Sequence, residues 1–323
     1  MTQTITLWDG RSVPRVGIGC WAIGGPVTVS YAGANDVDSL AGLRAADEMG
    51  AKLFDTSSAY GFGHSERLLG QAFGERDDIV IVTKFGYSGD PESGLGYPPD
   101  VTPTGIRRSI DASRRNLRRD RLDLALLHIN EHPPEEAGPV FDTLQALVTE
   151  DKIAAFGWST DAVDSVRAFA DRPGFVAVEH DFNLFDRAEA MMDFVAERNL
   201  LALGRLPLAM GLLTGKYNQG QRVADGDIRA SAYDWLKFFS GGAATTDFVV
   251  RLEAVRELLT SDGRSLAQGA LGWILARSPH APVPGFRTEA QVRDNLGALA
   301  KGALGPNVMA EIDTILTKDF EDA

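Results

Sequence analysis

The stretch IVIVTKFG, residues 79–86, sets the first constraint on the fold. Its four apolar residues run without a polar interruption and are followed by Thr83 and Lys84. A second stretch, LDLALLHIN at residues 122–130, has a similar run that leads to His128. Strands that read as continuous apolar runs are buried on both faces, as in parallel sheets covered by helices. Both stretches are therefore predicted to be interior strands of an α/β domain.

Eight strand candidates follow an N-terminal hairpin, and helical patterns separate them. The hairpin is predicted from Asp9-Gly10, which stands between two short alternating segments. The strands are expected at 16–21, 53–56, 79–85, 122–129, 154–159, 176–182, 201–208 and 282–286. Helices are expected to begin at Asp36, as the cap, and at Thr102-Pro103, and to cover 135–150, 161–170, 187–198, 248–259 and 289–299. This alternation predicts an α/β fold, a (β/α)8 TIM barrel, with a doubly wound open sheet as the rival.

The whole chain, residues 1–323, is predicted to form this single domain, because no linker composition and no clear internal repeat interrupts it. One long loop is expected after the seventh strand, from Thr214 to about Asp247. Loops of that length in a compact domain are usually functional or disordered. This loop would lie on the catalytic face of the barrel, because it follows the carboxyl end of a strand.

Composition and charge disfavour several classes of function. A formal net charge of -13 makes binding to nucleic acid or to an anionic membrane unfavourable. The basic run from Arg107 to Arg119 is interpreted as the solvated face of a helix. The single cysteine, Cys20, excludes a disulfide framework, and no stretch resembles a signal peptide or a membrane span. A cytoplasmic protein without nucleic-acid or membrane partners is expected.

Polar side chains stand where the predicted strands end. Asp55 ends the second strand, Lys84 the third and His128 the fourth, and Tyr60 follows Asp55 in the next loop. Barrel active sites gather at these ends, so the four should converge. A nearby ammonium lowers the pKa of a tyrosine, and Asp55 would keep a buried Lys84 charged. With His128 on the same substrate oxygen, the set predicts a tyrosine that donates a proton to a carbonyl.

Residues 54–70, FDTSSAYGFGHSERLLG, resemble the most recognisable motif of the aldo-keto reductase superfamily, with Asp55 and Tyr60 at the catalytic spacing. VTKFG then supplies Lys84, LDLALLH supplies His128, and the similarity extends to about residue 300. The resemblance implies that Tyr60 is the general acid, tuned by Lys84 and Asp55. It implies that His128 orients the carbonyl. The expected activity is NADPH-dependent reduction of an aldehyde or ketone, a small-molecule carbonyl substrate, to the alcohol.

The same resemblance assigns an NADP(H) site. PVPGFRTEAQVRDN, residues 282–295, resembles the adenosine-phosphate clamp, in which Arg287 would grip a 2′-phosphate. PLAMGLLTGKY, residues 207–217, resembles the segment that holds the pyrophosphate. GIGCWA at 17–22 imitates a dinucleotide fingerprint, but Gly24-Gly25-Pro26 follows where a helix should begin, so a Rossmann fold is rejected. The expected cofactor contacts are Gly19, Cys20, Trp21, Ser159, Thr160, Glu179, Arg205, Leu208, Gly211, Leu213, Lys216, Gly285, Arg287, Gln291 and Asn295.

Three positions depart from the family pattern. Ser159-Thr160 stands where the family usually has Ser-Asn for the nicotinamide amide, and Glu179 aligns with a usual glutamine. An ionised carboxylate only accepts hydrogen bonds, so Glu179 would bind the amide NH2 alone. Arg205 stands where a tyrosine often stacks on the nicotinamide, and a guanidinium plane also stacks.

Two other functions stay open from the sequence. Lys84 would be the Schiff-base nucleophile in a barrel aldolase. The chain would otherwise be a non-catalytic NADP(H)-binding regulatory module that acts through a partner, a case that ion-channel β subunits of this superfamily resemble. No metal site is expected, because prolines break the helix that would align His128 with His132. Oligomeric state stays open, and Trp235, Phe238 and Phe239 suit an aromatic pocket wall or an amphipathic helix equally.

Overall fold

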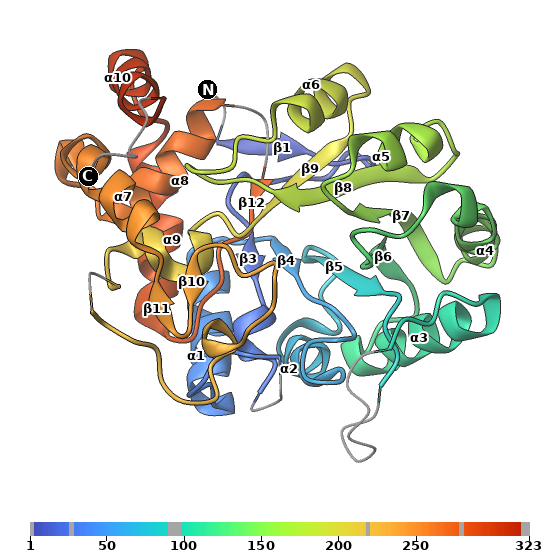
Figure 1. The fold of residues 1–323 in the computed structure, drawn as a ribbon. Coiled ribbons are helices and arrows are strands. Elements are labelled where there is room, and N and C mark those ends of the chain that lie inside the picture. The colour runs from blue at the N-terminus through green and yellow to red at the C-terminus, as the bar shows by residue number, and fades with distance from the viewer. Residues whose placement is uncertain (1–2, 26–28, 90–97, 218–219, 278–280, 318–323) are drawn as a thin grey trace.

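A parallel sheet of eight strands forms the centre of the protein (Figure 1). The computed structural model describes residues 3–25, 29–89, 98–217, 220–277 and 281–317. The strand order is β12-β9-β8-β7-β6-β5-β4-β3, so each strand pairs with the next barrel strand along the chain. The strands are β3 (Ile18–Gly19), β4 (Leu53–Asp55), β5 (Val80–Phe85), β6 (Leu122–Leu127), β7 (Ile153–Ser159), β8 (Phe175–Asp181), β9 (Leu201–Arg205) and β12 (Ala281–Pro282).

Backbone contacts between the first and last strands close the sheet into a barrel. The Gly19 N–H donates to the Pro284 carbonyl at 3.0 Å, and Gly19 forms a parallel bridge with Gly285. The two chains approach so closely that a Cβ on Gly19 would lie 2.5 Å from the carbonyl oxygen of Val283. The predicted (β/α)8 TIM barrel is therefore confirmed, and the open sheet is excluded.

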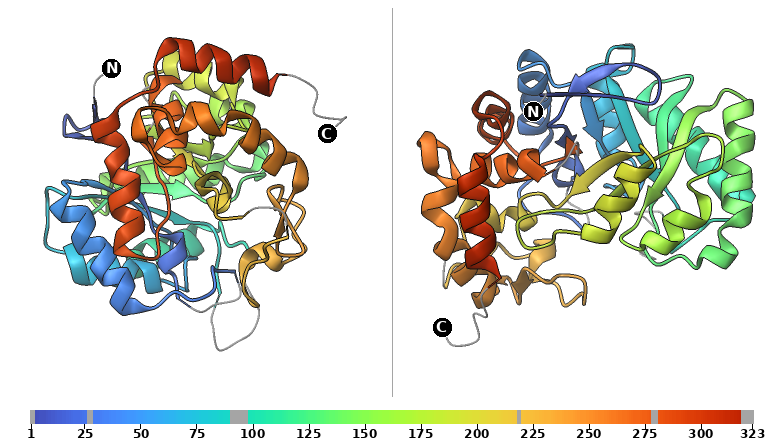
Figure 2. Two further views of the ribbon diagram at one scale, coloured as in Figure 1. Left: turned by 90° about the vertical axis from the view of Figure 1, so that its left-hand side faces the viewer. Right: turned by 90° about the horizontal axis from the view of Figure 1, so that it is seen from above.

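Helices surround the barrel, and the predicted hairpin lies against its core. The views in Figures 1 and 2 agree that α7, α8 and α10 lie together on one flank, with α3, α4 and α5 on the other. The hairpin pairs β1 (Thr4–Thr6) with β2 (Ser12–Pro14), and Leu7 and Val13 join the core inside the barrel. The helices are α1 (Asp36–Glu48), α2 (His64–Phe73), α3 (Pro103–Leu117), α4 (Gly138–Thr149), α5 (Val163–Phe169), α6 (Glu189–Glu197), α7 (Thr246–Leu259), α8 (Leu266–Arg277), α9 (Glu289–Lys301) and α10 (Pro306–Leu316).

The helix predictions were correct at most positions and wrong at a few. Thr102 caps α3 as predicted, because its side chain accepts from the Gly105 N–H. The cap of α1 is Asn35, which accepts from the Asp38 N–H at 2.9 Å, so the predicted Asp36 cap is wrong by one residue. Helices α2, α8 and α10 were not predicted. α8 is buried on nearly all sides and so lacks the amphipathic period that reveals a surface helix.

The basic run is only partly a solvated face. Arg107 forms a two-point surface pair with Glu150, as the interpretation expects. Arg119 is different, because its side chain is only 8% exposed, pairs with Asp123 at 2.7 Å and also donates to backbone carbonyls. That arginine therefore has a structural role. In the described part of the chain, none of the helices has the length and apolar character needed to cross a membrane.

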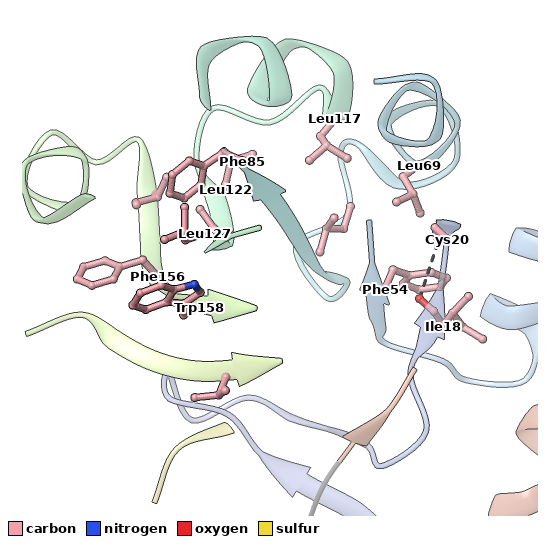
Figure 3. Close-up of a cluster of buried hydrophobic side chains, with 14 of the residues drawn as sticks. Ile18, Cys20, Phe54, Leu69, Phe85, Leu117, Leu122, Leu127, Phe156 and Trp158 are labelled. Atoms are coloured by element: carbon pink, nitrogen blue, oxygen red, sulfur yellow. Dashed lines mark hydrogen bonds between the residues drawn. The ribbon is translucent and has the colours of Figure 1, made fainter. Parts of the chain in front are cut away.

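Alternation along the strands decides which side chains face the barrel interior. On β5, Val80 and Val82 belong to the core inside the barrel, whereas Ile81 and Phe85 pack beneath the helices, where Figure 3 shows Phe85. Lys84 has the parity of Val82 and therefore points inward. The same parity directs a ring of polar residues inward at the carboxyl ends of the strands: Asp55, Lys84, His128, Ser159, Glu179, Asp181 and Arg205.

The described residues of the long segment after β9 form short elements of their own. They include η3 (Ala209–Thr214), η4 (Ile228–Ala230) and the hairpin of β10 (Phe239–Ser240) with β11 (Ala243–Ala244). Phe238 and Phe239 are buried in a core with the C-terminal helices, and no helix forms around Trp235. The amphipathic-helix alternative is therefore wrong, and of the three aromatic residues only the half-exposed Trp235 faces the cavity described below.

Gly19→Ala is expected to destabilise the fold by about 1–3 kcal/mol, because the new methyl group overlaps the Val283 carbonyl and forces β3 away from β12. Equilibrium unfolding in denaturant measures the loss. Gly285→Ala is the matched control, since a Cβ there has its nearest neighbour at 3.9 Å. Equal destabilisation by the two substitutions would contradict the explanation based on the closing contact.

Candidate active site

A fully buried lysine is the centre of the polar group inside the barrel. The Lys84 Nζ donates to the two carboxyl oxygens of Asp55 at 2.6 and 2.7 Å and to the Thr56 carbonyl at 3.0 Å. It also donates to the Tyr60 hydroxyl at 3.3 Å. Glu179 reaches it from β8, which lies across the barrel from β4, and its Oε2 is 3.2 Å from Nζ. A buried ammonium is tolerated only with such partners.

Burial and two carboxylates together set the protonation states in this group. Burial alone would lower the pKa of Lys84, but Asp55 and Glu179 outweigh it and raise that pKa above its usual value. Burial and the charge of Glu179 raise the pKa of Asp55 to about 8, against the opposing effect of Lys84. Burial also raises the pKa of Tyr60, and Lys84 offsets this only in part. Lys84 does act to lower the pKa of Tyr60, as predicted, but the prediction of a lowered pKa overall is wrong because burial outweighs this effect.

The state of Lys84 also decides against one alternative function. A Schiff-base nucleophile must lose its proton and reach the carbonyl carbon of its substrate. Lys84 has a raised pKa, is fully buried and is held at two points by Asp55. The geometry therefore disfavours the aldolase reading.

His128 completes the predicted set on the cavity side. Its Nδ1 lies 3.0 Å from the Ser57 hydroxyl, and its ring meets the Tyr60 ring edge-on with centroids 5.8 Å apart. Burial and the cations Lys84 and Arg205 lower the pKa of His128 well below its usual value. The ring is therefore neutral near pH 7, with one nitrogen as donor and the other as acceptor. The structure brings Asp55, Tyr60, Lys84 and His128 together, as expected.

A cavity of about 1300 Å³ extends from this group over the carboxyl ends of the strands. Pockets for one drug-sized ligand measure roughly 300–1,000 Å³, so this cavity has room for a larger ligand or for two. Asp55, Tyr60 and His128 line one part of it. The expected cofactor residues that line it are Gly19, Trp21, Glu179, Arg205, Leu208, Gly211, Lys216, Gly285, Arg287, Gln291 and Asn295.

One part of the cavity suits an anion. The loop that leads into α9 is held by the helix itself, since Gln291 accepts from the Arg287 N–H at 2.8 Å and Asn295 donates to the Gly285 carbonyl at 3.2 Å. The Arg287 side chain donates to the Ala32 carbonyl at 2.6 Å and lines the cavity. A helix N-terminus adds partial positive charge to that of the guanidinium.

The segment after β9 has a strained backbone beside the cavity. Leu206, Ala209 and Met210 have φ values of 49°, 47° and 56°, in a left-handed backbone region that residues other than glycine rarely adopt. Strain of this kind costs roughly 1–3 kcal/mol per residue and clusters at ligand sites. Leu208 and Gly211 of the same segment line the cavity.

Two expected cofactor contacts have their side chains in the core. Leu213 is fully buried among the aromatic and aliphatic residues of the C-terminal helices. Cys20 is fully buried beneath the helices, and its Sγ lies 3.8 Å from the Ile18 carbonyl, as Figure 3 shows. Neither residue is part of the cavity wall. Both side chains therefore contribute to packing. Strand parity directs the Cys20 side chain away from the cavity, and the turn after β9 does the same for Leu213.

Arg205 is held by a network that the sequence analysis missed. Its Nε donates to Asp181 at 2.7 Å, its Nη2 to Asp161 at 2.5 Å and its Nη1 to the Ser159 hydroxyl at 3.0 Å. The Thr160 hydroxyl donates to a backbone carbonyl at 2.6 Å. Ser159 and Thr160 are therefore engaged by the protein and do not line the cavity. The sequence did contain a signal for Asp181: it lies two residues after Glu179 on β8, so its side chain is expected on the same inward face.

The long segment after η3 forms part of the cavity wall and is tied to the first loop of the barrel. Arg229 pairs with Asp227 at 2.7 Å and donates to the Tyr217 hydroxyl at 2.7 Å. Its guanidinium also lies over the Tyr31 ring, 4.9 Å from the centroid. The Ala32 N–H donates to Asp227 at 3.2 Å. The predicted functional loop is thus fixed to the cavity by a buried ion pair.

Aromatic rings flank Tyr60 and His128. The Trp21 ring is stacked on the Tyr60 ring with their centroids 6.1 Å apart, and the centroid of the Trp235 ring lies 6.1 Å from that of Trp21. The Tyr87 ring lies 5.5 Å from His128. Among the residues that the structure describes, no three His, Cys, Asp or Glu side chains are arranged to hold a metal ion. The cavity beside the tyrosine therefore offers apolar contact and a small number of polar groups.

Comparisons with known proteins agree with this architecture. Aldo-keto reductase yakc of Schizosaccharomyces pombe, whose name specifies NADP(+), is 29% identical over an alignment of 304 positions, which covers 89% of this chain and 84% of that protein. A probable voltage-gated potassium channel subunit beta of Oryza sativa subsp. japonica is 26% identical, and the alignment covers 95% of this chain and 94% of that protein. The structure of the glycerol dehydrogenase AKR11B4 from Gluconobacter oxydans superposes with a TM-score of 0.83 at 25% sequence identity. The superposition covers 99% of this chain and 98% of that one.

The model of the Aldo/keto reductase family matches residues 15–317, nearly the whole chain. The sequence motif, the closed barrel and the lysine-centred group lie within that match. The chain belongs to the aldo/keto reductase family.

Proposed function

We propose that this protein is an NADPH-dependent oxidoreductase that reduces an aldehyde or ketone to the alcohol, with Tyr60 as the general acid. The observation that carries the proposal is the Tyr60 hydroxyl, 3.3 Å from the buried Lys84 ammonium at the edge of the cavity. A phenol with a raised pKa keeps its proton until negative charge develops on a carbonyl oxygen beside it. Membership in the aldo/keto reductase family supports this chemistry.

Each polar group has a role in the proposed reaction. NADPH supplies, when bound, the hydride for the carbonyl carbon. Tyr60 gives its proton to the carbonyl oxygen, and the Lys84 ammonium stabilises the phenolate that remains. Asp55 keeps Lys84 charged and in place. His128, held through Nδ1 by Ser57, binds the same oxygen through its other ring nitrogen and sets its direction.

The wall of the cavity fits NADP(H). Arg287 and the N-terminus of α9 would hold the 2′-phosphate, which matches the planar fork of a guanidinium. Lys216 and the strained backbone around Gly211 would lie along the pyrophosphate. The NADP(+) in the name of the yeast relative supports the same cofactor.

The substrate side favours a carbonyl compound with an apolar or aromatic substituent. Trp21 and Trp235 form one wall and Tyr87 another, and all three lie on the cavity near Tyr60. The proposal includes a single domain over residues 1–323 that acts on a small molecule in the cytoplasm, without a nucleic-acid or membrane partner. The net charge of -13 supports the last point.

Tyr60→Phe is expected to lower kcat roughly 10²–10⁴-fold for an activated aromatic aldehyde, because the ring stays and only the proton donor is lost. The loss of NADPH absorbance measures turnover, and fluorescence titration should give a nearly unchanged Kd for NADPH. Tyr233→Phe, which removes a hydroxyl from a half-exposed ring outside the Lys84 group, is the control. A Tyr60→Phe protein that keeps most of its rate would disprove the general-acid assignment. Tight NADPH binding by wild type without turnover would favour the regulatory module instead.

Arg287→Gln is expected to weaken NADPH binding about 10–100-fold and to leave NADH binding nearly unchanged, because only NADPH carries the 2′-phosphate. Isothermal titration with each cofactor measures the two affinities. Arg293→Gln, on the helix α9 that follows Arg287, is the control, since Arg293 pairs outward with Glu289 and Glu48. Equal losses for NADPH and NADH would show that Arg287 acts on the loop rather than on the phosphate.

A further inference from the structure

We propose that Glu179 is a positioning residue of this site: with Asp55 it forms a carboxyl pair on Lys84 that holds one proton, and the charge of this pair governs how readily Tyr60 gives up its proton. The role assigned to Tyr60 rests on the proposed function. The carboxyl pair itself is a property of the chain and does not depend on it.

The number of donors is the first argument. An ammonium has three protons, yet five oxygens lie within 3.3 Å of the Lys84 Nζ. Asp55 and the Thr56 carbonyl take the short contacts. Glu179 Oε2 lies at 3.2 Å, is buried, and has no hydrogen-bond partner within the described ranges. A buried carboxylate oxygen without a donor is unfavourable, whereas a proton on either carboxyl gives the pair a donor of its own.

The number of charges is the second argument. Asp55, Lys84 and Glu179 are each at most 3% exposed. Two ionised carboxylates beside one ammonium would leave a net negative charge on these buried side chains, and one retained proton makes the group neutral. The pKa of Asp55, raised to about 8 by burial and by Glu179, agrees with a proton held near neutral pH.

Among the described residues, no cation other than Lys84 forms an ion pair with Glu179. Arg205, on the neighbouring strand β9, is already paired with Asp161 and Asp181. Besides its own three members, the described polar and titratable groups beside the Glu179–Lys84–Asp55 cluster are Tyr60, His128, Ser159 and Arg205. The Cys20 thiol points away from the cavity but interacts electrostatically with Asp55 and Lys84. Burial raises the pKa of the Cys20 thiol, and burial lowers the pKa of His128, so both stay neutral.

The consequence for Tyr60 follows from the charge of the pair. Below about pH 8 the pair carries one negative charge, which the Lys84 ammonium balances, and a phenolate at Tyr60 gains from the ammonium. When the pair loses its proton, a second negative charge opposes that phenolate. Tyr60 then gives a proton less readily and takes one more readily, so alkaline pH slows reduction and favours alcohol oxidation.

Infrared spectroscopy of the protein without cofactor tests the pair directly. In wild type, the C=O band of a protonated carboxylic acid is expected to disappear as the pH rises through about 8. Glu179→Gln keeps the size of the side chain and should abolish this transition, because Asp55 alone beside Lys84 stays ionised. Glu66→Gln is the matched control, since Glu66 is a buried carboxyl held by Thr83 and Asn116 outside the group. A transition unchanged in Glu179→Gln would overturn the proposal.

Unfolding measurements give a second test with a definite sign. The folded-state pKa of Asp55 lies above its ordinary value of 3.8, so the wild-type free energy of unfolding should fall as the pH rises from 3.8 towards 8. The fall ends once the folded pair has lost its proton. Glu179→Gln should lack most of this fall. The denaturation midpoint of the variant, relative to that of wild type, should therefore increase as the pH rises to about 8. Parallel pH dependences in the two proteins would contradict the pair.

Turnover measurements then separate this inference from the proposed function. With NADPH and an aromatic aldehyde, the alkaline fall in kcat that wild type shows near pH 8 should be absent in Glu179→Gln, because the variant has no carboxyl proton to lose there. An identical pH profile in the two proteins would overturn the effect on Tyr60. No turnover in any protein, with the infrared transition present, would overturn the proposed function and would still establish the pair.

Discussion

The site depends on one interaction, the ion pair of Lys84 with Asp55 inside a barrel of apolar strands. Removing an ammonium from water is expensive, and only oxygens at short distance offset that cost. This ion pair fixes Lys84 behind Asp55 and Tyr60, which line the cavity, and places the phenol of Tyr60 beside a positive charge. Every role proposed for the neighbouring groups follows from that fixed charge.

Much of this arrangement follows from strand periodicity, and so it was available in the sequence. The period of two that makes IVIV an interior strand also turns Lys84 inward, and the same rule applies to Asp55 and His128. What periodicity does not supply is distance across the barrel. Glu179 was expected to meet a cofactor amide, and it does line the cavity. Its contact with Lys84 at 3.2 Å was not predicted, because β8 and β4 face each other only after the sheet has closed.

The other differences also have local physical causes. Cys20 and Leu213 were assigned to the cofactor by resemblance, yet their side chains are in the core. α8 escaped prediction because it is apolar on nearly every side, and a helix of that kind leaves no periodic signal. The lowered pKa expected for Tyr60 considered one cation and neglected burial, which acts in the opposite direction and is larger.

The contact that closes the barrel has a thermodynamic consequence. Gly19 and Gly285 bridge the first and last strands, and both residues also line the cavity. A ligand bound there would touch the two ends of the sheet at once, so occupancy and barrel closure are linked equilibria. A bound ligand would therefore oppose opening of the barrel between β3 and β12. Resistance to unfolding in this protein should therefore rise with the concentration of the ligand that it binds.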